Sequence, residues 1–392
     1  KIPLSIFLDL SKAFDSLNHS ILLYKLKHYG IDGTALDICT DYLTNRHQYV
    51  EQDNAKSDLT AIHTGVPQGS MLGPFFFLVY INDFINCSKQ FEMINYADDT
   101  TLLTTLNAST TNTTNPERDS EINRELSKIQ KWLIANKLCL NAKKTKFMVF
   151  HSPRRHITIP KLEITDSPIE CVATFNFLGI LIDKHVSWKP HISQLRKRAG
   201  HVCCILNKLK QFLPKNVLKI IYNSLISCHF NYGILVWGSK AHQLFKTQKK
   251  AIRIISNSKY NAHTEPLFKE LNILKIKDLK FLSEVKFYYK FLRGNLPIYF
   301  LNGYLSYHQD IHNYNTRNRG HITTPNIHLE LSKSNLRFRI TSTINECPDP
   351  IKSKLHSHSL LGLSKYIKGY SFAQYKTECI IPNCRICARN QS

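Results

Sequence analysis

Two adjacent aspartates, Asp98 and Asp99, are the residues whose types and spacing point most directly to chemistry. They lie in the sequence YADD at residues 96–99, between two β-prone apolar runs. Like charges this close raise each other's pKa, so keeping both carboxylates ionised without a cation is unfavourable. Successive strand side chains point to opposite faces, so one carboxylate should enter the site and its neighbour point partly away. We expect a metal site with Asp98 as the direct ligand and Asp99 as the auxiliary one.

A third carboxylate, Asp9, ends the nearly continuous apolar run of residues 2–8. This run predicts a strand buried on both faces, and an acid at its end is unsuited to packing. Carboxylate oxygens suit Mg²⁺ or Mn²⁺ better than zinc. Two such ions can hold the attacking and leaving oxygens of an in-line phosphoryl displacement. Asp9, Asp98 and Asp99 together therefore predict nucleotidyl-transfer chemistry.

Three motifs in this order resemble the palm of a reverse transcriptase. They are LDLSKAFD at residues 8–15, GVPQGS followed by LGP at residues 65–74, and YADD. The nearest likeness is to the non-LTR retrotransposon group, LINE, jockey or CR1-like, strongly over the first half and more loosely over residues 186–380. It implies an RNA-directed DNA polymerase that adds deoxynucleoside triphosphates to a DNA primer on an RNA template, with Mg²⁺ or Mn²⁺ as cofactor.

The resemblance also implies roles for residues near the first two motifs. Phe14, five residues beyond Asp9, matches a bulky aromatic residue that lies beneath the sugar and excludes a ribose 2′-OH. A core phenylalanine is the alternative. Gln68 and Gly69 match the loop that contacts the template base and the nucleotide. Its glycines and prolines favour a turn whose backbone can approach a ligand closely.

Two later stretches carry the remaining site predictions. Lys144 matches a lysine that can protonate the leaving pyrophosphate as a general acid, and a solvated cluster at a strand start is the alternative. Phe177, Leu178 and Gly179 resemble the hairpin that grips the primer end. Glycine suits close backbone approach there, although strand packing would also explain the apolar residues.

The elements that must position these residues predict an α+β fold. We expect a polymerase palm over residues 1–185, with a small antiparallel sheet carrying the three aspartates. Helices are expected near residues 15–29, 71–84 and 120–136, and an Asn- and Thr-rich surface loop over residues 107–119. An all-helical thumb-like region should follow at residues 186–300. Residues 301–392 should form a loosely ordered C-terminal region of unknown function.

Charge is distributed unevenly along the chain. Residues 1–99 contain 7 Lys and Arg against 12 Asp and Glu, and the remaining residues contain 45 against 17. Amphipathic basic helices are predicted at residues 189–210, 216–229 and 242–256. One basic face is usually only a solvated face. Several such faces after a palm favour contact with a nucleic-acid backbone.

The cysteines indicate the cellular setting. Eleven of them without a paired framework favour a reducing, intracellular location, for which we expect nucleus and cytoplasm. No apolar run is long enough to span a bilayer, so no membrane association is expected. Cys379, Cys384 and Cys387 have a C-x4-C-x2-C spacing. Zinc needs a fourth ligand that has no regular position here, so free thiols are favoured over a zinc site.

The chain begins directly on the strand that carries Asp9. Reverse transcriptases place basic fingers before this strand, so we expect a C-terminal fragment that lacks the fingers. The alternative function is a truncated, catalytically silent nucleic-acid-binding remnant with the palm as a scaffold. The intact aspartates favour the enzyme, and the missing fingers favour the remnant.

Overall fold

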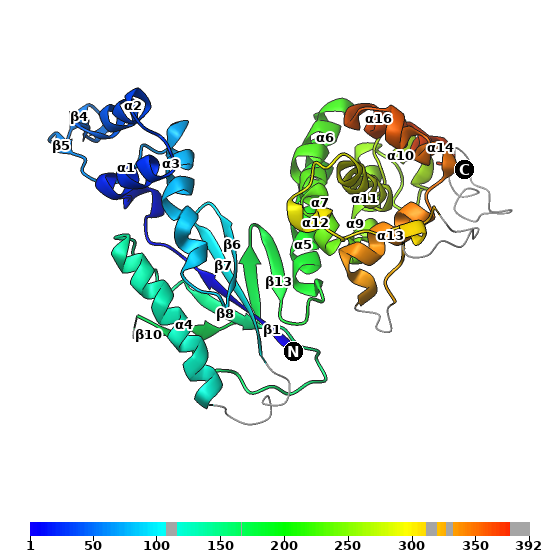
Figure 1. Ribbon diagram of the computed structural model, residues 1–392. Coiled ribbons are helices and arrows are strands. Elements are labelled where there is room, and N and C mark those ends of the chain that lie inside the picture. The colour runs from blue at the N-terminus through cyan, green and yellow to red at the C-terminus, as the bar shows by residue number, and fades with distance from the viewer. Residues whose placement is uncertain (107–115, 166, 311–319, 327–331, 377–392) are drawn as a thin grey trace. The chain divides into compact units, whose positions relative to one another are not determined.

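The computed structural model describes residues 1–106, 116–165, 167–310, 320–326 and 332–376 (Figure 1). It divides into two compact units, Lys1–Ser187 and Trp188–Ser392. The first contains both strands and helices, and the described part of the second is helical apart from an isolated bridge between Tyr307 and Ile322. The α+β expectation is therefore confirmed at the level of a mixed fold with small sheets.

A five-stranded sheet organises the first unit. Its strands are β1 (Ile2–Leu8), β6 (Glu92–Tyr96), β7 (Asp99–Leu106), β8 (Lys146–Val149) and β11 (Glu170–Cys171), in the order β11-β8-β1-β7-β6. As its apolar run predicts, β1 is central and buried, and it pairs antiparallel with β7 and β8. The expected antiparallel sheet is confirmed for β1, β6, β7 and β8, and the edge strand β11 departs from it by pairing with β8 in parallel. The chain returns to the starting end of β8 before it enters β11.

Two-stranded ribbons complete the β structure of this unit. They are β2 (His47–Gln48) with β5 (Thr60–Ala61), β3 (Glu51–Gln52) with β4 (Ala55–Lys56), β9 (Glu163–Ile164) with β10 (Ser167–Pro168), and β12 (Thr174–Phe177) with β13 (Ile180–Asp183). In the sequence, the first two pairs lie between the second and third helices.

Four helices support the sheet, and a 3-10 turn follows β1. The helices are α1 (His19–His28), α2 (Thr34–Leu43), α3 (Leu72–Ile81) and α4 (Pro116–Ala135), and the turn is η1 (Ala13–Asp15). The Asn18 side chain caps α1 by accepting from the Ile21 amide, so this helix starts later than predicted. Helix α4 buries the predicted stripe of Ile122, Leu126, Ile129 and Leu133. It begins at Pro116, and proline is suited to the first turn of a helix. The loop predicted over residues 107–119 is therefore wrong for residues 116–119, and residues 107–115 lie outside the described part.

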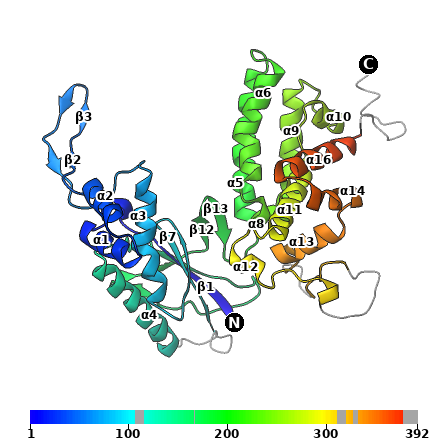
Figure 2. The ribbon, with the colours of Figure 1, turned by 45° about the horizontal axis from the view of Figure 1, so that its top comes forward.

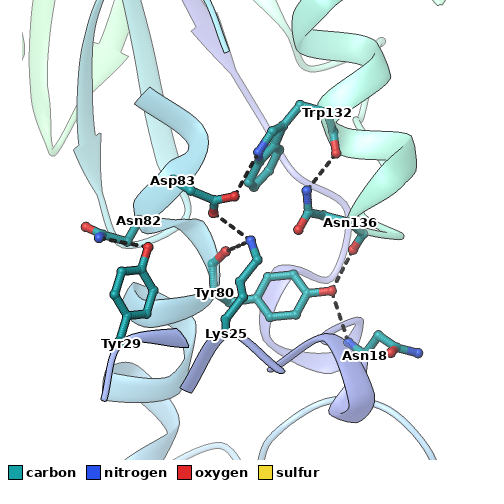
Figure 3. A network of polar contacts seen from close by, with 8 residues as sticks. All are labelled: Asn18, Lys25, Tyr29, Tyr80, Asn82, Asp83, Trp132 and Asn136. Carbon is teal, nitrogen blue, oxygen red and sulfur yellow. Dashed lines mark hydrogen bonds and ion pairs between the residues drawn. The ribbon is translucent and has the colours of Figure 1, made fainter. Parts of the chain in front are cut away.

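A polar network fastens α1, α3 and α4 together (Figure 3). The Lys25 ammonium donates to the Tyr80 carbonyl and to the Asp83 carboxylate, each at 2.6 Å. The Trp132 indole donates to the other Asp83 oxygen at 3.3 Å, and the Tyr80 hydroxyl donates to the Asn136 carbonyl at 2.6 Å. Burial lowers the pKa of Lys25, and Asp83 acts in the opposite direction. The network fixes the helices that lie beside the sheet.

The second unit is built from helices. They are α5 (Lys189–Leu209), α6 (Lys215–Tyr222), α7 (Cys228–Asn231), α8 (Ile234–Trp237), α9 (Phe245–Ile255), α10 (Glu265–Glu270), α11 (Ile276–Leu292), α12 (Ile298–Leu301), α13 (Leu336–Asn345), α14 (Asp349–Lys352), α15 (Lys354–Ser357) and α16 (Leu360–Ala373). A π-helical turn, η4 (Asn223–Ser227), joins α6 to α7, and a 3-10 segment, η5 (Gly238–Leu244), precedes α9. The predicted basic helix at residues 189–210 is confirmed, with Ile192, Leu195 and Ala199 buried.

The expectation of loose order beyond residue 301 is wrong for residues 336–373. Helices α13 and α16 pack on α11, and Figure 2 shows α11 beside α8 and α13. Ile340, Ile344, Leu363 and Ile367 are buried in these contacts. Each helix supplies only a narrow apolar stripe within a polar sequence, so the composition of this region does not reveal its helices. Cys379, Cys384 and Cys387 lie outside the described residues. Within the described residues, no helix is both long and apolar enough to cross a membrane.

Candidate active site

Neighbouring strands bring the predicted carboxylates together. Asp9 directly follows β1, and Asp99 begins β7, the antiparallel partner of β1. Tyr96 pairs with Asp99, so Ala97 and Asp98 form the tip of the β6–β7 hairpin, with Ala97 in the left-handed region at φ 52°. Two distant parts of the sequence thus meet at one end of the central strands, as expected for a sheet that carries the aspartates.

The pKa of Asp99 reflects both its burial and its acidic neighbours. The pKa of Asp99 is raised, first because partial burial disfavours its charged form and then because the charges of Asp98 and Asp9 repel it. This is the repulsion expected from the adjacent aspartates in the sequence. A bound cation would relieve it.

Asp9 and Asp99 share a cavity of about 470 Å³. Its polar wall also contains Lys143, Lys144 and Lys146. Asp98 is not among the described residues that line this cavity. The structure therefore places the second aspartate of the pair on the wall and the first in the turn. The assignment of Asp98 as the direct ligand stays a prediction.

The donor set suits a hard cation that shares its coordination with a substrate. Within the described ranges, no three His, Cys, Asp or Glu side chains are grouped closely enough to hold a metal ion by themselves. Mg²⁺ is commonly bound through one or two carboxylates, with phosphate and water oxygens completing its shell. Asp9 and Asp99 at one cavity, with Asp98 adjacent, fit this pattern better than an all-protein cage.

A buried threonine positions Asp9 beside the lysine cluster. The Asp9 amide donates to the Thr145 hydroxyl at 3.4 Å, and this hydroxyl donates to the Asn141 carbonyl at 3.0 Å. The Lys144 ammonium lies 4.0 Å from the Asp9 carboxylate and is largely exposed. Sequence reasoning identified Lys144 and missed Thr145, because a single threonine between lysines carries no signal of its own.

The glycine-rich loop packs directly on the turn after Asp9. A Cβ at Gly65 would lie 2.7 Å from the Asp15 Cα, and its φ of +84° is in the left-handed region. The Gln68 amide donates to the Asp15 carboxylate at 2.9 Å. Gln68 and Asp15 line a second cavity of about 880 Å³, together with Lys12 and Arg46. Gly69, at φ +85°, has nothing within 4 Å of its Cβ position.

Phe14 occupies the 3-10 turn between these two motifs. Its ring is partly buried and lies 4.7 Å from the Phe77 ring on α3. Phe14 lines neither of the two cavities described above. The predicted role in excluding ribose stays a prediction, and the packing role is visible.

The predicted hairpin at residues 177–179 is confirmed as a hairpin. Leu178 and Gly179 form its two-residue turn with φ of 47° and 79°, values typical of the tight turns that match strand twist. Phe177 lines the Asp9 cavity, and Phe175 stacks on Phe7 of β1 with ring centroids 3.9 Å apart. The hairpin is therefore a wall of the site, and its grip on a primer stays a prediction.

A carboxylate trio at the end of a sheet, beside lysines, is the class of site used in metal-assisted nucleotidyl transfer. Residues 3–182 match the family model described as reverse transcriptase (RNA-dependent DNA polymerase). This stretch is similar to reverse transcriptase domains, and the curated relatives confirm its likeness to the enzymes of non-LTR retrotransposons.

Three of the curated relatives are proteins of mobile elements from Drosophila melanogaster. The chain is 27% identical over 288 residues to the RNA-directed DNA polymerase from mobile element jockey, covering 69% of this chain and 30% of that protein. It is 24% identical to the probable RNA-directed DNA polymerases from transposon X-element and from transposon BS. These alignments cover 70% of this chain, and 30% and 31% of those proteins. The chain thus spans about 30% of the length of these relatives.

Among solved structures, apo telomerase from Candida Tropicalis is similar with a TM-score of 0.39 and 12% identity. The superposition covers 71% of this chain and 47% of that chain. At this TM-score the likeness is too loose to support conclusions about individual elements.

Proposed function

We propose that this chain is the catalytic part of a non-LTR retrotransposon protein and synthesises DNA on an RNA template. The observation that carries the proposal is the cavity shared by Asp9, Asp99 and Lys144, within a stretch that matches the reverse transcriptase family. The raised pKa of Asp99 supports a function for this site in binding a cation.

The proposed mechanism assigns a task to each predicted residue. Asp9, Asp98 and Asp99 would hold Mg²⁺ or Mn²⁺, which stabilises the charge on the attacking primer oxygen and the leaving pyrophosphate. Lys144 donates a proton to the pyrophosphate as it leaves, because an ammonium beside Asp9 faces the same cavity. The Thr145 hydroxyl, which accepts from the Asp9 backbone amide, keeps Asp9 at the edge of the cavity.

Residues on either side of the carboxylates select and hold the substrates. Gln68 and Gly69 contact the template base and the incoming deoxynucleoside triphosphate, and Phe14 excludes a ribose 2′-OH. The hairpin at residues 177–179 holds the end of the DNA primer, with Phe177 already on the cavity wall.

The second unit contributes the nucleic-acid contacts in this proposal. Residues 188–392 contain 33 Lys and Arg against 9 Asp and Glu, whereas residues 1–187 contain 19 against 20. A helical unit with this excess of positive charge suits the phosphate backbones of an RNA template and a DNA primer. We propose residues 186–300 as a thumb-like region, residues 301–392 as a C-terminal region of unknown function, and nucleus and cytoplasm as the location.

Primer extension on an oligo(dT)-primed poly(A) template, with Mg²⁺ or Mn²⁺, tests the proposal. We expect extension by the parent chain and by the control Asp53→Asn, which changes an exposed acid in a distant hairpin. Asp9→Asn, Asp98→Asn and Asp99→Asn should each abolish it. A larger loss for Asp98→Asn than for Asp99→Asn would support Asp98 as the direct ligand.

The same assay separates the enzyme from the silent remnant. Extension by Asp98→Asn at the parent rate would overturn the metal-site assignment. Absence of extension by the parent, combined with salt-sensitive RNA binding by the parent and all variants, would favour the nucleic-acid-binding remnant.

A further inference from the structure

A polar cavity in the second unit has a composition unlike the palm site. It has a volume of about 560 Å³ and lies among α6, η4, α11 and α16. Three lysines and three asparagines line it together with two serines, and no acidic residue of the described chain does. The six are Lys219, Lys286, Lys368, Asn223, Asn231 and Asn272.

The lysines of this cavity have no carboxylate partner among the described residues. In the part of the chain that the structure describes, none of Lys219, Lys286 and Lys368 has a carboxylate oxygen within 4.0 Å of its ammonium. On the same helices, Lys215 pairs with Glu270 at 2.5 Å and Lys280 with Glu284 at 3.7 Å. Among the described residues, the three lysines that line the cavity therefore bring positive charge that no neighbouring carboxylate compensates.

One helical run supplies a regular polar stripe to the cavity. Lys219, Asn223, Ser227 and Asn231 follow one another at intervals of four residues and all line it. A stride of four exceeds the 3.6 residues of an α-helical turn, so such a stripe would drift around a regular α-helix. The wider π-turn η4, Asn223–Ser227, takes up part of that drift. π-Turns of this kind occur frequently at functional sites.

The remaining contacts organise the stripe and provide an apolar wall. The Asn231 amide donates to the Ser227 carbonyl at 2.8 Å and to its hydroxyl at 3.2 Å. Across the cavity, Leu279 and Leu282 are buried on α11, and Phe372 on α16 is partly exposed. The cavity therefore offers ammonium groups for an anion, amides for hydrogen bonds and an aromatic ring for stacking.

We propose that this cavity binds the phosphate of a nucleotide unit, either a free nucleotide or one within a single strand. Three ammonium groups without a carboxylate partner among the described residues match a multiply charged phosphate oxyanion, and Phe372 can stack on a base. A volume of about 560 Å³ lies within the usual range for small-ligand pockets. The proposal does not depend on polymerase activity, since every residue it uses belongs to the second unit.

Charge reversal in the 392-residue chain tests the proposal. Lys368→Glu alters the cavity, and Lys365→Glu is the matched control, because Lys365 is exposed on the same helix and does not line the cavity. Binding of ATP and inorganic pyrophosphate is measured by calorimetry in EDTA, which suppresses metal-dependent binding at the palm. Binding of a ten-nucleotide single-stranded RNA is measured by fluorescence anisotropy at fixed salt. Thermal unfolding verifies that both variants fold.

We expect Lys368→Glu to weaken binding of at least one phosphate probe tenfold or more, and Lys365→Glu to weaken it less than twofold. Asn223→Asp, which keeps the side-chain size and adds a negative charge, should reproduce the loss. A loss confined to ATP and pyrophosphate identifies a free nucleotide, and a loss confined to RNA identifies a nucleotide in a strand.

Three results would overturn the proposal. One is equal affinity of Lys368→Glu and Lys365→Glu for every probe. Another is no measurable binding of ATP, pyrophosphate or RNA by the parent chain. The third is a specific loss of poly-glutamate binding alone, which would make the cavity a site for acidic protein segments. Failure of primer extension would leave these measurements unaffected.

Discussion

The catalytic assignment depends on where single side chains lie around Asp9. Its carboxylate faces Lys144, and its backbone is tied to the same turn through Thr145. Lys143 and Lys144 are adjacent, and both line the cavity. Their shared location makes them a matched pair for separating proton donation from general positive charge.

Lys144→Ala should slow nucleotide addition about 100-fold or more, in the range typical of a lost general acid. Lys143→Ala removes an equal charge from the same cavity and should have a much smaller effect. Single-turnover primer extension measures both rates. Equal losses for the two variants would show that the lysines act only as a solvated positive cluster.

Gly65 and Gly69 form a second matched pair. Both have positive φ, but only at Gly65 would a Cβ meet the backbone of Asp15, at 2.7 Å. Gly69→Ala should lower the free energy of unfolding by about 1–2 kcal/mol, the cost of a left-handed non-glycine residue. Gly65→Ala should lower it by a further 1–3 kcal/mol, roughly the cost of overpacking. Urea denaturation measures both, and equal values would contradict the close approach.

At the scale of elements, the sequence predicts those whose pattern is local. The apolar run of β1, the stripe of α4 and the glycine turn between β12 and β13 all specify their structure within a few residues. The parallel pairing of β11 depends on a return of the chain that no local pattern encodes. The contact of Lys25 with Asp83 joins positions 58 residues apart, and periodicity cannot reveal it.

Lys25→Met tests the network that joins α1, α3 and α4. Lys25 is 11% exposed and Asp83 40% exposed, so the loss should be smaller than for a fully buried pair. We expect the free energy of unfolding to fall by about 1–3 kcal/mol, because Asp83 and the Tyr80 carbonyl lose a donor. Lys27→Met, an exposed change on the same helix, should have little effect. Adding Asp83→Asn to Lys25→Met should restore part of the loss, and no recovery would argue against the ion pair.

Helix α5 carries a pH-dependent contribution to stability through His191. Burial lowers the pKa of His191 below its ordinary 6.5, and the charge of Arg198 adds to this. Above pH 6.5 both the folded and unfolded states are neutral at this site. As the pH falls through 6.5 toward the lower folded-state pKa, the unfolded state binds the proton first, so stability is lost in that window.

Unfolding of the parent at pH 7.5 and 5.5 should therefore show a loss that His191→Gln reduces, by at most about 1.4 kcal/mol per pH unit. The comparison uses the difference between the two pH values, so a general destabilisation by the substitution cancels. His201→Gln changes an exposed histidine of the same helix and should retain the parent's loss. The same pH difference in His191→Gln as in the parent would show that the acid sensitivity arises elsewhere.

At the scale of the whole chain, the structure locates the charge asymmetry more sharply than the sequence does. The sequence separates an acidic stretch of residues 1–99 from a basic remainder. The division into units at residue 187 leaves the first unit at a net charge of −1 and the second at +24. The carboxylate site therefore belongs to the first unit and the excess positive charge to the second. The sequence alone does not show this division, because it does not show where the core of the first unit ends.

This partition predicts how nucleic-acid binding depends on salt. Each phosphate contact through Lys or Arg contributes about −0.9 to the slope of log affinity against log salt concentration. Arg196, Lys197 and Arg198 are exposed on α5, and their joint replacement by Gln should make the slope less steep by up to about 3. Joint replacement of Lys27, Lys89 and Lys131, exposed in the first unit, removes equal charge and should leave the slope unchanged. Fluorescence anisotropy with an RNA–DNA duplex at several salt concentrations measures both. Equal slope changes would mean that net charge, and not the helical unit, determines binding.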